Sequence, residues 1–260
     1  MPDELAGRTI LVTGGTGDLG SATAGLLAAH GARVAVADLR PPSSTTAPPL
    51  RPAGGERLPY FPVDVRRRSS VEALFSCLDD AGLSPDTVIC NAGFVHNAPF
   101  LEVSDDDWEQ TLAVNLTGCF LVGQVAARRM VAIGTRGLIL LTSSWVQDIP
   151  WTDGTSYCTS KSGLKMLARC MARDLAPHGI RVNTIASGIV DAGLSRQVMG
   201  EDPRFRERAL RVIPLRELQT AEGVAQAMLW SCLPASDYMT GATLLIDGGC
   251  SLYAFDQDGG

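Results

Sequence analysis

The sequence predicts an α/β fold: a single domain over residues 1–260, with a doubly wound parallel sheet and helices on both faces. Short runs of Val, Ile and Leu alternate with longer segments in which apolar residues recur with helical periodicity. The short runs are apolar throughout, which is typical of parallel strands buried on both faces. Alternation of such strands with helices is the pattern of a doubly wound domain, and no break in composition divides the chain.

The first strand is expected at residues 9–13, and the helix after it at 19–30, where Gly31 provides a C-terminal stop. Further strands, each bounded by Gly, Pro or polar residues, are expected at 32–38, 86–91, 137–143, 180–185 and 242–246. The long helical patterns lie between them, at 69–81, 105–133, 157–176 and 221–231.

Two of these helices carry a signal at their start, and one connection is unusual. Ser69 and Glu72 have the spacing of a capping box. Ser104 precedes three aspartates, whose charge suits a helix N-terminus. The segment 41–59 contains six prolines and a Ser/Thr cluster, so we expect an irregular surface connection there instead of a crossover helix.

Composition and charge exclude several classes of protein. Hydrophobic residues make up 45% and charged residues 19% of the chain, which indicates a globular protein. The net charge of −6 argues against a nucleic-acid binder. The seven cysteines form no CxxC pair and only three histidines occur, which argues against a disulfide framework or a metal site. Since we find no signal-peptide core and no apolar run long enough to span a bilayer, we expect a cytoplasmic protein with no membrane contact.

The segment TGGTGDLG at 13–20 joins the first strand directly to a helix. Glycines permit a tight turn and a close approach of the backbone to a ligand. The helix N-terminus presents free N–H groups and a partial positive charge, both of which favour an anion. Because the turn lies between the first strand and the first helix, it predicts a pyrophosphate site, with a purely structural turn as the alternative.

Asp38 ends the second expected strand and bears on the choice of dinucleotide. A carboxylate at this point can accept hydrogen bonds from both ribose hydroxyls of an adenosine and repels a 2′-phosphate, which favours NAD over NADP. Arg40 is the opposing signal, because an arginine nearby can hold a 2′-phosphate. We expect NAD, with NADP as the alternative.

Further motifs lie in order between Thr13 and Gly249: NAG at 91–93, a Tyr157-Cys-Thr-Ser-Lys161 segment, VN at 182–183 and TGATLLIDGG at 240–249. With these motifs the sequence resembles the short-chain dehydrogenase/reductase family. The resemblance implies a Rossmann-type domain with a seven-stranded parallel sheet, an NAD(P) cofactor, a small alcohol or carbonyl substrate and a homotetramer or homodimer. It also implies that the helices at 105–133 and 157–176 pack across a subunit interface, burial within one subunit being the alternative.

The resemblance implies a catalytic set of Asn115, Ser144, Tyr157 and Lys161. In it Ser144 binds the substrate oxygen, Lys161 holds the nicotinamide ribose and Asn115 positions a water that relays protons. Tyr157 and Lys161 lie four residues apart and share one face of a helix. We expect the ammonium, with the positive nicotinamide, to lower the pKa of the phenol until Tyr157 acts as the general base.

The same resemblance, with the two aspartates and the glycine-rich turn, gives the expected cofactor-binding residues. Asp64, after a strand that the resemblance places third, is expected at the adenine edge, and the small residues that follow the strand at 86–91 let the backbone approach the cofactor. The full set is Gly14, Thr16, Gly17, Asp18, Leu19, Gly20, Asp38, Asp64, Val65, Asn91, Ala92, Gly93, Tyr157, Lys161, Gly188 and Ile189.

Three positions depart from the family pattern. Asp18 replaces a glycine of the turn, and a carboxylate beside a pyrophosphate is unfavourable unless it turns away or caps the helix. Ser187 replaces the proline before Gly188. Ala192 replaces a threonine, which removes one hydrogen bond to the nicotinamide carboxamide.

The substrate pocket is expected at the strand ends and their loops, with the segment 191–212 as a lid over it. Aromatic, amide and carboxylate groups suit a sugar, polyol or cyclitol, which makes oxidation of a secondary alcohol with NAD the favoured function. A ketoreductase of lipid, steroid or secondary metabolism and a non-catalytic dinucleotide-sensing module are the alternatives. The candidate substrate residues are His96, Ser144, Trp145, Gln147 and Trp151.

Overall fold

A computed structural model describes residues 3–41, 57–201 and 204–252. Its seven strands are all parallel and lie in the order β3-β2-β1-β4-β5-β6-β7. The chain reverses its direction of travel across the sheet between β1 and β4, and ligands of such sheets bind beyond the carboxyl ends of the strands at that point. The strands are β1 (Thr9–Thr13), β2 (Arg33–Asp38), β3 (Tyr60–Pro62), β4 (Thr87–Cys90), β5 (Leu138–Ser144), β6 (Arg181–Ser187) and β7 (Thr243–Ile246).

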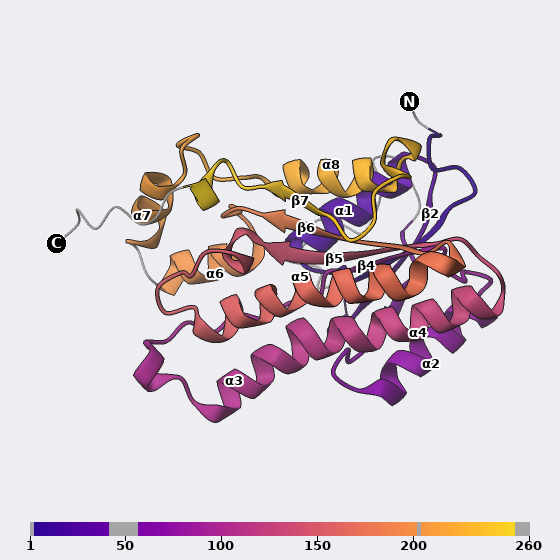
Figure 1. The fold of residues 1–260 in the computed structure, drawn as a ribbon, viewed down its shortest axis with the longest axis horizontal. Coiled ribbons are helices and arrows are strands. Elements are labelled where there is room, and N and C mark those ends of the chain that lie inside the picture. The colour runs from indigo at the N-terminus through magenta and orange to yellow at the C-terminus, as the bar shows by residue number, and fades with distance from the viewer. Residues whose placement is uncertain (1–2, 42–56, 202–203, 253–260) are drawn as a thin grey trace.

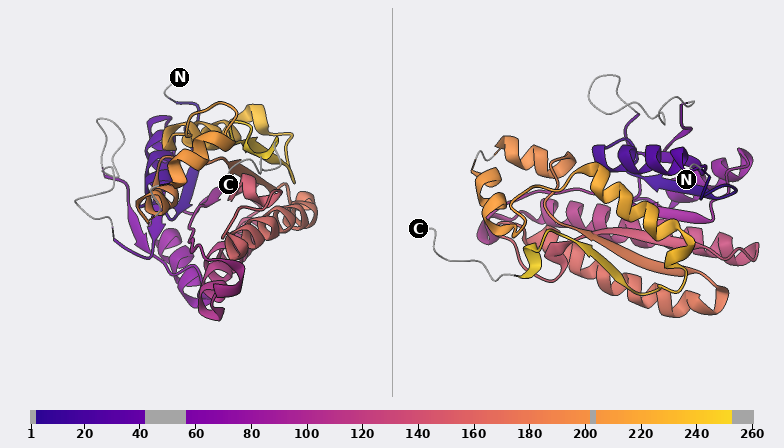
Figure 2. Two further views of the ribbon diagram at one scale, coloured as in Figure 1. Left: turned by 90° about the vertical axis from the view of Figure 1, so that its left-hand side faces the viewer. Right: turned by 90° about the horizontal axis from the view of Figure 1, so that it is seen from above.

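Helices cover both faces of the sheet, as the sequence predicts, with α1 and α8 on one face and α2, α4 and α5 on the other (Figure 1). Two short helices, α6 and α7, lie beyond the carboxyl ends of the strands (Figure 2). The helices are α1 (Asp18–Ala29), α2 (Arg68–Asp80), α3 (Asp105–Leu112), α4 (Gly118–Ala132), α5 (Thr155–Leu175), α6 (Gly193–Glu201), α7 (Phe205–Val212) and α8 (Ala221–Cys232).

The register of the central strands explains the two apolar layers. Leu11 pairs with Val88, and Val88 pairs with Ile139, and this row packs against α2, α4 and α5. The adjacent row, which includes Val12 and Ile89, faces α1 and α8. Because successive side chains of a strand point to opposite faces, a run of apolar residues fills both layers at once.

Several details differ from the sequence-based expectation. The predicted helix at 105–133 is interrupted by a π-helical turn at Ala113–Thr117. The capping box at Ser69 and Glu72 is wrong, because α2 begins at Arg68 and has no side-chain cap. The cap at Ser104 is confirmed, since its hydroxyl accepts the Asp107 amide hydrogen. Of the proline-rich segment 41–59, residues 42–56 lie outside the described residues.

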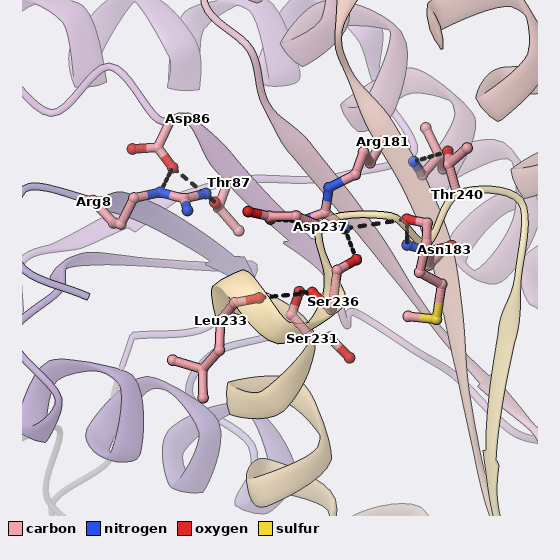
Figure 3. A network of polar contacts seen from close by, with 12 residues as sticks. Arg8, Asp86, Thr87, Arg181, Asn183, Ser231, Leu233, Ser236, Asp237 and Thr240 are labelled. Carbon is pink, nitrogen blue, oxygen red and sulfur yellow. Dashed lines mark hydrogen bonds and ion pairs between the residues drawn. The ribbon is translucent and has the colours of Figure 1, made fainter. Parts of the chain in front are cut away.

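A polar network joins the segments at the amino ends of β1, β4 and β6 (Figure 3). Arg8 Nε donates to Asp86 Oδ1 at 2.7 Å, and Arg181 pairs with Asp237. Asn183 Nδ2 donates to the Met239 carbonyl oxygen at 2.8 Å. These bonds tie the loops at this end to the strands and leave the opposite end for a ligand.

One helical stretch, Asp105–Ala132, is long and apolar enough to cross a membrane by length and composition alone. Within its most apolar window, however, 56% is buried inside the protein. Val122 and Met130 are buried against the sheet and its neighbouring helices. This is the packing of a core helix.

Candidate active site

A cleft of about 1160 Å³ runs along the carboxyl ends of the central strands. Its walls come from the turn after β1, the ends of β2, β4, β5 and β6, and helices α5 and α6. All sixteen expected cofactor-binding residues line this cleft, from Gly14 to Ile189. The fold therefore brings together residues that are far apart in the sequence, at the place where the topology predicts a dinucleotide.

The glycine-rich turn is packed too closely for a larger residue at its first position. Gly14 has a φ of +64°, and a Cβ built on it would lie 2.6 Å from the Ala92 Cα. Asn91 Nδ2 donates to the Gly14 carbonyl oxygen at 3.1 Å, which ties this turn to the end of β4. The turn and the helix N-terminus behind it form a backbone cradle that fits the pyrophosphate of a dinucleotide.

Asp38 faces this turn from the end of β2. Its Oδ2 accepts hydrogen bonds from the Thr16 hydroxyl at 2.7 Å and from the Thr16 amide at 3.1 Å. Its Oδ1 accepts a longer bond, of 3.4 Å, from the Arg40 amide. The carboxylate is thus oriented by the turn, and Oδ1 has capacity left for a ribose hydroxyl.

Asp64 also lines the cleft, next to an arginine. Arg66 donates to both carboxylate oxygens, from Nε and from Nη2, each at 2.8 Å. This bidentate pair holds the pKa of Asp64 below its ordinary value. An adenine contact through Asp64 must therefore use the lone pairs that Arg66 leaves free.

Tyr157 and Lys161 lie one turn apart on α5 and both face the cleft. Lys161 is buried, lies 5.3 Å from the centre of the Tyr157 ring, and donates from Nζ to the Thr142 carbonyl oxygen at 2.8 Å. Ser144, the last residue of β5, reaches the tyrosine with its hydroxyl. Three of the four expected catalytic residues therefore line one end of the cleft.

The electrostatics of this group differ from the expectation. Burial raises the pKa of Tyr157 to about 12, and the hydrogen bond with Ser144 opposes the rise without overcoming it. Burial also lowers the pKa of Lys161 to about 8. Burial therefore dominates in the protein alone. The expectation that the ammonium and the positive nicotinamide together lower the phenol pKa stays a prediction for the cofactor-bound protein.

Asn115 lies in the π-helical turn and is fully buried. Its Oδ1 accepts from the Phe94 amide at 2.8 Å, while its Nδ2 donates to the Phe94 carbonyl oxygen and to the Ser160 hydroxyl. Among the described residues, Asn115 does not line the cleft. The side chain is a positioning group, which holds the loop after β4 against α5, and its proton-relay role stays a prediction.

Comparison with known proteins agrees with this geometry over nearly the whole chain. A family model described as enoyl-(acyl carrier protein) reductase matches residues 16–251. The 3β-hydroxysteroid dehydrogenase 1 of Eggerthella lenta is 34% identical over 262 residues, covering 100% of this chain and 99% of the relative. The chain belongs to the short-chain dehydrogenase/reductase family. It is an oxidoreductase that acts on secondary CH–OH groups of small molecules with a nicotinamide dinucleotide.

Other members of the family are similarly close. Glucose 1-dehydrogenase 2 of Bacillus subtilis is 33% identical, with 97% of this chain and 98% of the relative covered. A solved short-chain dehydrogenase/reductase from Mycobacterium marinum superposes with a TM-score of 0.87 at 31% identity, covering 96% of this chain and 97% of the other. A solved Agrobacterium tumefaciens protein, with a proposed 2-deoxy-D-gluconate 3-dehydrogenase activity and bound NADP, gives a TM-score of 0.85 at 30% identity over 97% of this chain and 99% of its own.

The part of the cleft next to Tyr157 is aromatic. Trp145 and Trp151 meet edge to face with ring centres 5.5 Å apart, and Trp151 meets Phe205 of α7 at 5.9 Å. All three line the cleft. Phe205 is a pocket residue that the sequence did not single out, although it is a lone aromatic residue in an arginine-rich helix.

Two of the expected substrate residues lie elsewhere. His96 is absent from the described residues that line the cleft, and its Nε2 lies 3.4 Å from Asp107 Oδ2 at the surface. Gln147 is buried behind β5, where its side chain accepts a hydrogen bond from the Ser143 hydroxyl. Neither is among the described residues that line the cleft. Ser144, Trp145 and Trp151 do line it.

Asp18 is the departure in the turn, and the structure places its carboxylate on a partner in another segment. Its Oδ2 accepts from the Gly193 amide at 2.9 Å and from Arg196 Nη1 at 3.0 Å. The carboxylate caps the start of α6 instead of its own helix. Arg196 is the second cleft residue that sequence reasoning missed.

Proposed function

We propose that the chain oxidises a secondary alcohol borne on a six-membered carbon ring, with NAD⁺ as hydride acceptor and Tyr157 as general base. The observation that carries the proposal is the position of Tyr157. It lies between Ser144 and Lys161 at one end of the dinucleotide cleft, and next to the aromatic wall of Trp145 and Trp151. A reacting alcohol at this point meets a proton acceptor and an apolar surface together.

In the proposed mechanism the Ser144 hydroxyl and the Tyr157 phenol bind the substrate oxygen. Bound NAD⁺ supplies the hydride acceptor and a positive charge. Tyr157 takes the hydroxyl proton during alcohol oxidation and returns it during carbonyl reduction. Lys161, held by the Thr142 carbonyl oxygen, keeps a positive charge behind the phenol ring below pH values of about 8. Its charge stabilises the phenolate that forms, and it lies within the cleft to bind a ribose hydroxyl.

The substrate class follows from the walls beside Tyr157. Trp145 and Phe205 are buried, and each meets Trp151 edge to face, which forms an aromatic wall. Ile189 and Val198 extend this apolar surface. Burial against these apolar walls favours the carbon face of a ring over an open-chain polyol, because the hydroxyls of the polyol would lose water without finding partners.

A substrate panel tests this proposal. With NAD⁺, we expect kcat/KM for substituted cyclohexanols to exceed that for open-chain polyols of similar size by about 100-fold, on the basis of two or three unpaired hydroxyls. NADH formation measures both, and Trp151→Ala is expected to remove most of the difference. Equal activity on the two classes, or an equal loss in both from Trp151→Ala, would contradict the proposed substrate class.

A pyranose sugar is the second candidate. Asn97 and Gln110 line the cleft and offer amide groups to hydroxyls. A relative from Bacillus subtilis is named glucose 1-dehydrogenase 2. Including glucose in the same panel separates the two candidates, because a pyranose substrate would outperform cyclohexanols and would depend on Asn97→Ala more than on Trp151→Ala.

The preference for NAD over NADP is supported by Asp38, which presents Oδ1 at the end of β2. We expect Asp38→Ser to lower the ratio of kcat/KM for NAD⁺ to that for NADP⁺ by about 50-fold, because a like-charge contact with a 2′-phosphate costs several kcal/mol. Arg40 then becomes available to that phosphate. The matched control is Asp237→Ser, which removes a carboxylate at the opposite end of the strands from the cleft. An unchanged ratio in Asp38→Ser would contradict the role of Asp38.

We also propose that the chain acts as a homotetramer or homodimer in the cytoplasm. Apolar side chains on α4 and α5 are exposed, among them Phe120, Val131 and Met166. All seven cysteines are free thiols, which suits a reducing compartment. Light scattering of the purified protein and fractionation of expressing cells test the two parts, and a monomer at micromolar concentration would contradict the first.

A further inference from the structure

We propose that Asp18 and Arg196 form a latch that fastens helix α6 onto the glycine-rich turn and slows dinucleotide release. The two residues lie in segments that are far apart in the sequence and meet at one wall of the cleft. The inference rests on dinucleotide binding by this chain, and it concerns positioning residues instead of catalytic ones.

The geometry of the latch consists of two hydrogen bonds to one carboxylate oxygen. Asp18 Oδ2 accepts from the Gly193 amide, the first of α6, at 2.9 Å. The same oxygen accepts from Arg196 Nη1, one turn further along that helix, at 3.0 Å. A carboxylate at a helix N-terminus is favoured by the free amides and by the helix dipole, and here the carboxylate comes from a different element.

Arg196 is itself held in place. Its Nη2 donates to the Asp191 carbonyl oxygen at 2.7 Å, and the Asp191 carboxylate lies 3.3 Å from Arg206 of α7. A chain of alternating charges thus runs from the glycine-rich turn through α6 to α7. Phe205, next to Arg206, forms part of the aromatic wall, so a change at Asp18 can reach the substrate end of the cleft.

The position of the latch gives it a consequence for the cofactor. Gly17, Asp18, Leu194 and Arg196 all line the cleft, and the latch joins the glycine-rich turn to α6 at its wall. While the latch is closed, α6 covers the turn that fits the pyrophosphate, and a bound dinucleotide leaves only after it opens. The Asp18 side chain is 23% exposed and that of Arg196 61% exposed, which places the pair among reversible surface contacts.

The latch also accounts for the unusual residue in the turn. A carboxylate next to a pyrophosphate repels it, but Arg196 neutralises Asp18 and the Gly193 amide draws the carboxylate toward α6. The turn therefore tolerates Asp18 as long as α6 is closed.

Hydrogen–deuterium exchange of the α6 amides in the cofactor-free protein tests the latch without any turnover. We expect about fivefold faster exchange in Asp18→Ala and in Arg196→Gln, the effect of losing one exposed charge pair. Because each variant breaks the same contact, α6 exchange in the double variant Asp18→Ala/Arg196→Gln is expected to be no faster than in either single variant. Arg196→Lys keeps the charge and is expected to restore part of the protection. The matched control is Asp79→Asn, which breaks the surface pair with Arg129 between α2 and α4.

Stopped-flow release of NADH, followed by its fluorescence, tests the consequence. Release is expected to be about fivefold faster in Asp18→Ala and in Arg196→Gln, and unchanged in Asp79→Asn. Unchanged α6 exchange in both latch variants would overturn the proposal, and so would unchanged NADH release. If Arg196→Gln sped release as strongly in the Asp18→Ala background as in the parent, Arg196 would act on the pyrophosphate directly and the latch would be wrong. A failure of NADH to bind at all would instead contradict the proposed function, since the exchange measurement does not depend on it.

Discussion

Replacing Tyr157 with phenylalanine is expected to lower kcat for alcohol oxidation by about 10³-fold while leaving the affinity for NADH within about twofold. The change removes a single oxygen atom, the one that exchanges a proton with the substrate. A positioned general base accelerates such a reaction by about 10²–10⁴-fold, and phenylalanine leaves no proton acceptor at that position. The measurement is NADH formation at saturating alcohol, with NADH affinity taken from fluorescence titration.

Two controls separate the chemical role of Tyr157 from a structural one. Tyr238→Phe changes a fully exposed tyrosine and is expected to leave kcat unchanged. Ser144→Ala removes the hydroxyl that bonds to the phenol, and we expect a smaller loss of kcat, of about 10²-fold. If Tyr157→Phe kept more than about a tenth of the parent kcat, the proton would be moving through another group, and the assigned mechanism would be wrong.

The pH dependence of the two directions follows from the same group. Because the pKa of Tyr157 is raised to about 12 by burial, the phenol is protonated at neutral pH in the cofactor-free protein. Alcohol oxidation needs the deprotonated phenol, so its rate should increase as pH rises. Carbonyl reduction uses the protonated phenol, so its rate does not depend on a rise in pH.

The features that the sequence predicted arise from contacts between residues close together in the chain, whereas the features that it missed arise from contacts between distant segments. The glycine-rich turn and the pair Tyr157 and Lys161 are local patterns, because a turn and one helical turn bring neighbours in the chain together. The motif resemblance implied a seven-stranded parallel sheet and placed Asp38 and Asn91 among the cofactor-binding residues, and both line the same cleft. Short-range geometry and known topology were therefore sufficient for the cofactor side of the site.

The contact of Asp18 with Arg196 could not be predicted in this way. It joins side chains from α1 and α6, and no periodicity or spacing records which arginine of the segment 191–212 meets the turn. His96 and Gln147 show the reverse error: both follow strand ends, but the partner that each finds, Asp107 and Ser143, turns it away from the cleft. Side-chain direction depends on packing that a linear pattern does not encode.

The same limit applies to charge. The sequence places an ammonium one turn from a phenol, which predicts a lowered phenol pKa. Burial is not visible in the spacing, and in the folded protein it penalises both ionised forms. The pKa of Tyr157 is raised and that of Lys161 is lowered, so at neutral pH the protein alone holds a neutral phenol beside an ammonium.

Replacing Lys161 with methionine is expected to lower kcat about 10³-fold and to change how stability depends on pH. Burial lowers the pKa of Lys161 to about 8 in the folded protein, from an ordinary value near 10.5. Below pH 8 both states carry the proton, and the folded protein bears the full cost of a buried charge. Between pH 8 and about 10.5 the unfolded chain keeps its proton while the folded protein loses it, so the free energy of unfolding rises with pH.

The parent protein should therefore gain stability relative to Lys161→Met by about 3 kcal/mol over that interval, at about 1.4 kcal/mol per pH unit. Urea unfolding of both proteins at several pH values measures the difference, in which the titration of other groups cancels. Lys165→Met is the matched control on the same helix, because Lys165 pairs with Asp148 at the surface. Its kcat is expected to stay near that of the parent, which would tie the loss at Lys161 to the buried site. A stability difference between the parent and Lys161→Met that did not change with pH would mean that Lys161 keeps its full charge at high pH, and the phenolate would then have a permanent cation beside it.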